Sequence, residues 1–124
     1  MTPKPRADLK PNTPEFENLP LVSPNGFREY DARWWFGHPA SDVAPELNLD
    51  GVQALGLVLG SLIHELGVAP KIAVGHDYRS YSLSVKQALE VGLMDAGIEV
   101  HDIGLALSPT AYFAQFDLDL PCVA

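Results

Sequence analysis

The chain contains little cysteine and few basic residues. Its single cysteine, Cys122, can form neither an internal disulfide nor a thiolate metal site, so we expect a reducing compartment, the cytoplasm. Eight Lys and Arg stand against 16 Asp and Glu among the 124 residues, which gives a formal net charge of -8. Nucleic acids and anionic membranes bind proteins through an excess of Lys and Arg, so neither is expected as a partner.

Long apolar runs and several well-known motifs are also missing. The longest apolar stretch, residues 51–67, is interrupted by Gln53, His64 and Glu65, so we expect no membrane span, and the first 20 residues lack the apolar run of a secretory signal. No Gly-x-Gly-x-x-Gly, no phosphate-binding Gly-x-x-x-x-Gly-Lys loop and no nucleophile elbow occurs. The four histidines lack the close pair spacing of zinc ligands, so no metal site is expected in this chain.

Proline is concentrated at the N-terminus, where residues 1–20 contain five. Such a polar, proline-rich segment buries too little apolar surface to offset its ordering entropy. We therefore predict a flexible arm over residues 1–20, attached to the fold through Phe16 and Leu19. Residues 21–124 then form a single domain.

The periodicity of residues 51–124 predicts alternating helices and strands. Apolar residues recur at helical steps over 52–66 and 82–96, and Gly67 and Gly97 stand where left-handed C-terminal residues belong. Gly56 and Gly60 predict a smooth helix face packed closely against a neighbour. Buried strands are predicted over 71–74 and 98–104, and a helix follows Ser108, with this residue as N-cap and with Tyr112, Phe113 and Phe116 as its apolar side. This order predicts a layered α/β domain with a largely parallel sheet.

The stretch "GFREYDARWWF", residues 26–36, mixes aromatic, basic and acidic side chains. Aromatic residues favour strands, so we predict a first strand over Phe27–Phe36. Two interpretations of its charges stay open: a half-buried edge strand with solvated charges, or a strand with side chains facing a ligand.

Loops 75–80 and 105–110 each connect a predicted strand to a helix. In parallel α/β sheets ligands collect at the carboxyl ends of strands, where helix N-termini present free N–H groups. Arg79 and the serines at 80, 82 and 84 would suit an anion such as phosphate. The alternative is that Asp77 and Arg79 pair with each other or brace neighbouring loops.

Three segments in register resemble the α-D-phosphohexomutases, and especially their bacterial phosphomannomutase/phosphoglucomutase branch. "GFREYDARW" is similar to Phe-Arg-x-Tyr-Asp-Ile-Arg-Gly, "AVGHDYRSYS" resembles Val-Gly-Arg-Asp-x-Arg-x-Ser, and "DIGLALSPTAYFA" resembles Asp-x-Gly-x-x-x-Thr-Pro. The chain departs from these patterns at Trp34, which replaces glycine, and at His76, which replaces arginine. The resemblance covers about residues 26–124.

The resemblance implies a three-layer α/β/α domain with a mixed, largely parallel four-stranded sheet. It also implies an enzyme of four domains that moves phosphate between O1 and O6 of a hexose through a phosphoserine and a bisphosphorylated sugar. Tyr30 matches a substrate-contacting tyrosine and Arg33 an arginine that faces the phosphoserine. Arg28, Asp77, Arg79 and Ser108 are expected to support the active-site loops.

The family's nucleophile segment, Thr-x-Ser-His-Asn, does not occur in the chain. We expect the strand that begins at Cys122 to be truncated and the serine to lie beyond Ala124. The implied Mg²⁺ would be held by that serine loop and a second domain, and glucose or mannose 1,6-bisphosphate would activate the enzyme. The expected partners are hexose phosphates and the remaining domains, and the chain alone would be inactive. Two alternatives stay open, a non-catalytic sugar-phosphate-binding or regulatory module and a structural α/β domain without a ligand.

Overall fold

The computed structural model describes residues 19–38 and 40–124. The predicted flexible arm, with Phe16, therefore lies outside the described residues except for Leu19 and Pro20. The chain divides into two compact units, one up to Ala54 and one over Leu55–Ala124. None of the helices in the described part of the chain has the length and apolarity needed to cross a bilayer.

The first unit has no strand where one was predicted over Phe27–Phe36. After the short 3-10 helix η1 (Pro24–Gly26), the chain forms a tight turn in which the N–H of Arg28 donates to Asp31 O at 2.8 Å, and only an isolated bridge joins Phe27 to Ala32. The prediction was wrong because local turn hydrogen bonds outweigh the strand preference of aromatic residues, which depends on cross-strand neighbours.

Trp34 supplies the packing of this turn. Its indole Nε1 donates to Ser23 O at 2.7 Å, and its ring meets that of Phe27 edge-on at a centroid distance of 5.1 Å. A Cβ at Gly26 would overlap the indole, so the ring occupies space that only glycine leaves free. The departure from the family pattern at Trp34 thus has a local structural role.

Asn48 anchors the start of the long helix α2 (Leu49–Glu65). Its Oδ1 caps the helix by accepting the N–H of Gly51 at 2.8 Å. The same oxygen accepts the N–H of Leu21 at 2.9 Å, and Nδ2 donates to Leu19 O at 2.6 Å. One buried amide therefore fixes both the helix start and the segment that precedes η1.

The second unit is built on two parallel strands, β1 (Lys71–His76) and β2 (Glu99–Leu105). Residues 122–124 extend along the other edge of β1, since Ala73 N donates to Cys122 O at 3.1 Å and Ala124 N to Ala73 O at 2.9 Å. This pairing agrees with a strand beginning at Cys122. The predicted four-stranded sheet is not formed by the described residues, which provide two strands and this short third segment.

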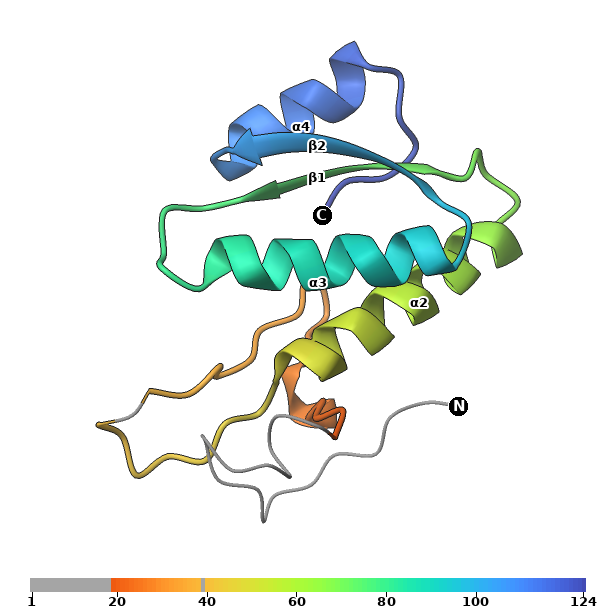
Figure 1. Ribbon diagram of the computed structural model, residues 1–124. Helices are drawn as coiled ribbons and strands as arrows, with labels where there is room; N and C mark the ends of the chain where they lie inside the picture. The colour runs from red at the N-terminus through yellow and green to blue at the C-terminus, as the bar shows by residue number, and fades with distance from the viewer. Residues whose placement is uncertain (1–18, 39) are drawn as a thin grey trace. The chain divides into compact units, whose positions relative to one another are not determined.

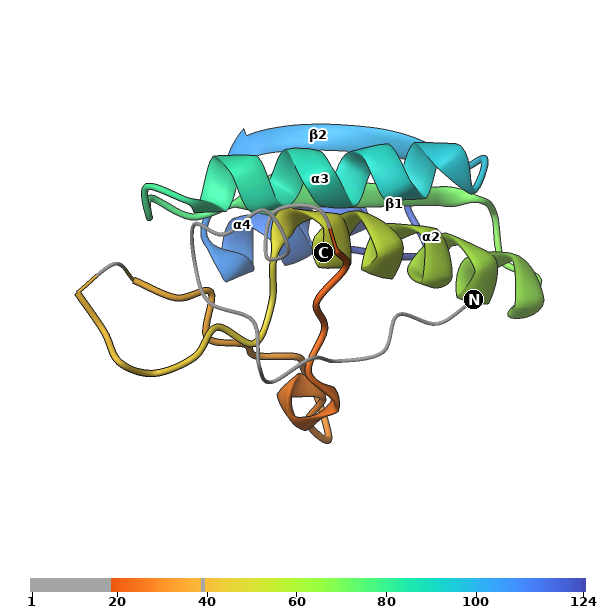
Figure 2. The same ribbon diagram turned by 60° about the horizontal axis from the view of Figure 1, so that its bottom comes forward.

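Helices cover both faces of these strands. Figures 1 and 2 show α3 (Ser82–Asp95) on one side of β1 and β2 and α4 (Ser108–Asp117) on the other, in agreement with an α/β/α layering. Gly67 and Gly97, with φ of +67° and +78°, follow α2 and α3 as predicted. The predicted apolar side of α4 is wrong: Tyr112, Phe113 and Phe116 are largely exposed, and no residue of α4 is buried.

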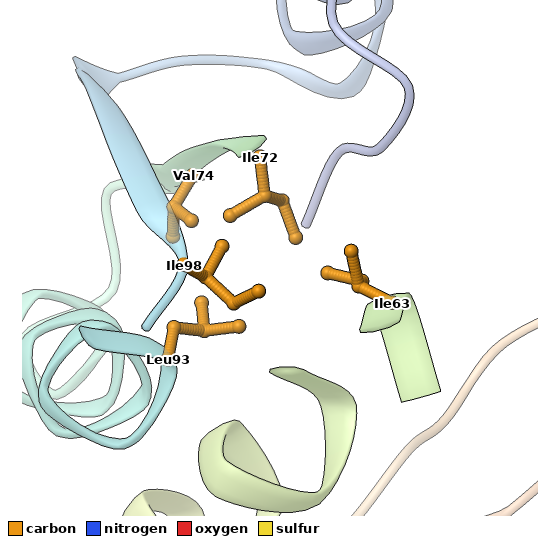
Figure 3. Packing of buried hydrophobic residues seen from close by; sticks show 5 residues of the cluster. All are labelled: Ile63, Ile72, Val74, Leu93 and Ile98. Carbon is orange, nitrogen blue, oxygen red and sulfur yellow. The ribbon is translucent and has the colours of Figure 1, made fainter. Parts of the chain in front are cut away.

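The core of this unit lies between the strands and the helices α2 and α3. Figure 3 shows side chains from both helices and the strand region converging; they are Ile63, Ile72, Val74, Leu93 and Ile98. Gly56 and Gly60 are buried, as the predicted smooth face requires. A Cβ at Gly56 would overlap Leu89 O, and one at Gly60 would overlap Ala96 Cβ. The two glycines therefore allow α2 and α3 to approach closely.

Candidate functional site

A pocket of about 310 Å³ opens at the carboxyl end of β1, within the second unit. Its wall combines the end of β1, the first two turns of α3 and the start of α4. Its polar members are His76, Asp77, Tyr81, Ser82, Lys86 and Ser108. Strand ends and two helix N-termini meet here because β1 and β2 are parallel and each is followed by a helix. Free N–H groups at helix starts favour anions, so this arrangement can bind one.

Asp77 organises the loop between β1 and α3. Its Oδ1 accepts the hydroxyl of Ser82 at 2.5 Å and the backbone N–H of Arg79 at 3.1 Å, while Oδ2 pairs with the Arg79 guanidinium at 3.1 Å. The Ser82 hydrogen bond, followed by that from the Arg79 N–H, lowers the pKa of Asp77 below its ordinary value. The pairing of Asp77 with Arg79 is the structural alternative described above.

Two further polar residues of the pocket wall are Ser108 and His76. Ser108 is the first residue of α4, and Leu107 occupies the N-cap position without a side-chain cap, so Ser108 is not the cap that was predicted. Its position still places it in the pocket wall. His76 donates from Nδ1 to Asp77 O at 2.8 Å.

Tyr30 and Arg33 lie in the turn of the first unit. Tyr30 is 91% exposed, and the Arg33 side chain is 77% exposed, with its Nε donating to Asp31 Oδ2 at 2.8 Å. An exposed ion pair of this kind adds little stability. Arg28 closes the turn through its backbone N–H. The turn therefore presents a phenol and a guanidinium to solvent, two groups suited to sugar and phosphate.

Sequence reasoning missed the buried charge of Lys86. Its side chain is only 4% exposed, and its Nζ contacts the carboxylates of Asp102 on β2 and Glu90 on α3, the latter at 3.4 Å. Burial alone lowers the pKa of Lys86, but the Asp102 hydrogen bond and the two negative charges outweigh it, and the net shift is upward. The signal was its helical spacing, because Lys86 lies three and seven residues before the core positions Leu89 and Leu93.

A divalent metal ion needs several ligating side chains that converge on one point. Within residues 19–38 and 40–124, no three His, Cys, Asp or Glu side chains come together in an arrangement that could hold a metal ion. Carboxylate oxygens are the usual protein ligands of Mg²⁺. We therefore assign no metal ligand to this part of the chain.

Comparison with known families identifies the fold. The model of the phosphoglucomutase/phosphomannomutase alpha/beta/alpha domain I matches residues 24–124. The chain belongs to this family. Among curated relatives, a phosphomannomutase of Escherichia coli is 40% identical over 92 residues, which cover 74% of this chain and 18% of the relative.

Other relatives of this domain I carry related names. A phosphomannomutase of Klebsiella pneumoniae is 39% identical over 92 residues, covering 74% of this chain and 52% of the relative. A probable phosphoglucosamine mutase of Thermococcus gammatolerans is 42% identical over 72 residues, covering 58% of this chain and 14% of the relative. The chain thus spans about half of the Klebsiella relative and less than a fifth of the other two.

Proposed function

We propose that this chain is the N-terminal domain of a phosphomannomutase/phosphoglucomutase that interconverts hexose 1-phosphate and hexose 6-phosphate. The reaction would proceed through a phosphoserine and a bisphosphorylated sugar. The observation that carries the proposal is the match of residues 24–124 to domain I of the family. A cytoplasmic location forms part of the same proposal.

The exposed turn supplies two residues with proposed roles. Tyr30 would contact the sugar, and Arg33 would face the phosphoserine, where a guanidinium can share charge with several phosphoryl oxygens during transfer. Their high exposure supports these roles, since a ligand can reach both side chains. Arg28 would support the turn.

The pocket residues would have supporting roles. Asp77 and Arg79, held together by an ion pair, would stiffen the loop that follows β1. Ser108 would support the loop that follows β2 from its place in the pocket wall. Rigid loops matter because phosphoryl transfer depends mainly on positioning and charge.

The remaining machinery is proposed to lie in other parts of the enzyme. The serine nucleophile, the ligands of Mg²⁺ and the sugar-reading groups are not assigned to these 124 residues, whose sequence contains no Ser-His-Asn. Mg²⁺ would neutralise charge on the transferred group, and glucose or mannose 1,6-bisphosphate would serve as activator. The isolated chain is accordingly expected to be inactive.

The proposal can be tested with the protein expressed from the complete reading frame that encodes this chain. Glucose 1-phosphate is supplied with Mg²⁺ and glucose 1,6-bisphosphate, and glucose 6-phosphate is detected through a coupled dehydrogenase. We expect turnover by the complete protein and none by the 124-residue chain. Arg33→Lys should lower kcat by about 100-fold, because lysine cannot reproduce the planar fork that faces the phosphoryl group.

Lys71→Gln is a suitable control, since the Lys71 side chain forms an exposed ion pair with Glu99 and lies outside the pocket wall. Its kcat should match that of the unmodified protein. A complete protein that binds mannose 1-phosphate without turnover would contradict the mutase proposal and favour the non-catalytic module. Turnover by the 124-residue chain would overturn the expectation that it is inactive.

A further inference from the structure

Lys86 is the buried charge that the proposed mechanism does not use. Its Nζ contacts one oxygen of Asp102, Oδ2, and thereby connects α3 to β2. The other oxygen, Oδ1, accepts the N–H of Gly104 at 2.7 Å. One carboxylate thus joins a buried ammonium group to a backbone position two residues further along β2.

Gly104 lies at an irregularity of the β1–β2 ladder. Val74 is opposite Asp102 but Gly75 is opposite Gly104, so Ile103 is an extra residue on β2. Gly104 has φ of +68°, a conformation that glycine adopts without steric cost. A bulge of this kind bends its strand and changes the direction of the residues that follow.

The residues after the bulge form one wall of the pocket. Ala106 donates its N–H to His76 O at 2.9 Å, and Ala106, Leu107 and Ser108 all line the pocket. Lys86 lines it as well, from α3. The contacts from Lys86 to Asp102 and from Asp102 to Gly104 therefore connect α3 to the segment that leads to Ser108.

We propose that Lys86 is a positioning residue, which acts through Asp102 to hold the bulge at Gly104 and so fixes the Ala106–Ser108 wall of the pocket for phosphoryl transfer. The catalytic part of this role rests on the proposed mutase function. The structural part stands independently, because it concerns only contacts within the second unit. Lys86 has carboxylate partners on both sides, so its charge is balanced by the protein and it is not proposed as a ligand for substrate phosphate.

Amide hydrogen exchange in the 124-residue chain tests the structural part. Lys86→Met keeps most of the side-chain length but removes the charge. It should speed amide exchange at Gly104 and Ala106 about tenfold, because the hydrogen bonds of these two amides would open locally more often. Exchange at Val74 and Leu93 in the core should stay within about twofold. Lys86→Arg should restore slow exchange at least in part.

Asp102→Asn is a second test that does not depend on the lysine variant folding. Asp102 is half exposed, and asparagine keeps the Oδ1 acceptor for the N–H of Gly104. It should also speed exchange at Ala106, because the link to Lys86 is weakened. Unchanged exchange at Gly104 and Ala106 in both variants would overturn the proposal. So would an equal rise at every core amide, which would mean general destabilisation.

Activity of the complete protein tests the catalytic part. Lys86→Met should lower kcat about tenfold and leave KM nearly unchanged. This pattern is expected when the Ala106–Ser108 wall is displaced during transfer and substrate binding is retained. Lys71→Met, at the exposed Glu99 pair, is the matched lysine control and should leave kcat unchanged. An active protein whose kcat is insensitive to Lys86→Met would refute the catalytic part. A protein without mutase activity would refute the proposed function instead, and the exchange result would still decide the structural part.

Discussion

The contact between α2 and α3 permits a quantitative prediction at Gly56. In Gly56→Ala the new methyl would overlap Leu89 O and would lie 3.0 Å from Leu93 N and 3.1 Å from Gly92 Cα. All three atoms belong to the backbone of α3, so no rotamer change can relieve the overlap. Overpacking costs about 1–3 kcal/mol, and a rigid backbone neighbour places this case near the upper end, at about 3 kcal/mol.

Alanine also favours the helix, which offsets part of this cost. The gain over glycine in a helix interior is about 1 kcal/mol, so the net loss of unfolding free energy is about 2 kcal/mol. With a urea m value of about 2 kcal/mol/M, the unfolding midpoint should fall by about 1 M. The measurement is urea unfolding followed by circular dichroism at the helical signal.

Gly60 provides a matched comparison on the same helix. Its added methyl would overlap Ala96 Cβ, which belongs to a side chain. Ala96→Gly should therefore recover most of the stability lost in Gly60→Ala, whereas it should not rescue Gly56→Ala. Ser61→Ala, at an exposed position of α2, should shift stability by less than about 0.5 kcal/mol. A midpoint for Gly56→Ala equal to or above that of the unmodified chain would refute the close approach of the helices.

Three other predictions concern polar groups. The pKa of Asp77 is lowered in the folded state, so its ionised carboxylate stabilises the fold above the ordinary pKa of 3.8, and this stabilisation is lost as the pH falls through the lower folded-state pKa. Ser82→Ala removes the main cause of the lowered pKa, so the free energy of unfolding should fall less steeply with decreasing pH in the acid range. An unchanged acid range would contradict this. Asn48→Ala should cost about 2–3 kcal/mol by removing the α2 cap and leaving Leu21 N unpaired, while Asn48→Asp, which keeps the Oδ1 acceptor, should lose less in the same urea assay. Trp34→Phe should lower the free energy of unfolding by about 1 kcal/mol, because it removes the hydrogen bond from the indole to Ser23 O. A larger decrease in Trp35→Phe would contradict the packing role of Trp34.

Local patterns predicted the second unit well. Helix periodicity located α2 and α3 to within a few residues, and Gly67 and Gly97 marked their ends, because a left-handed C-terminal residue is a local requirement. The close packing implied by Gly56 and Gly60 is also present. Such features depend on spacing along one helix, which a sequence displays directly.

The failures come from contacts that a local pattern does not specify. The aromatic stretch after Gly26 has strong strand preference, yet a tight turn and the Trp34 indole determine its conformation. The apolar side expected for α4 rested on Phe113 and its neighbours, and these side chains remain exposed because no described element covers them. The strand-to-helix topology predicted that the loops of Asp77 and Ser108 lie near each other, and both residues line one pocket. The Lys86–Asp102 contact was missed because it depends on how the side chains of α3 and β2 meet, which the spacing along either element does not specify.

The bulge on β2 also bears on solubility. In the described sheet β2 pairs with β1 along one side only, so its other side is a potential template for pairing with another chain. An extra residue at Ile103, the twist it introduces and the charges of Glu99 and Asp102 all make regular pairing along this edge unfavourable. We therefore expect the irregularity at Gly104 to disfavour edge-to-edge pairing of β2 with another chain.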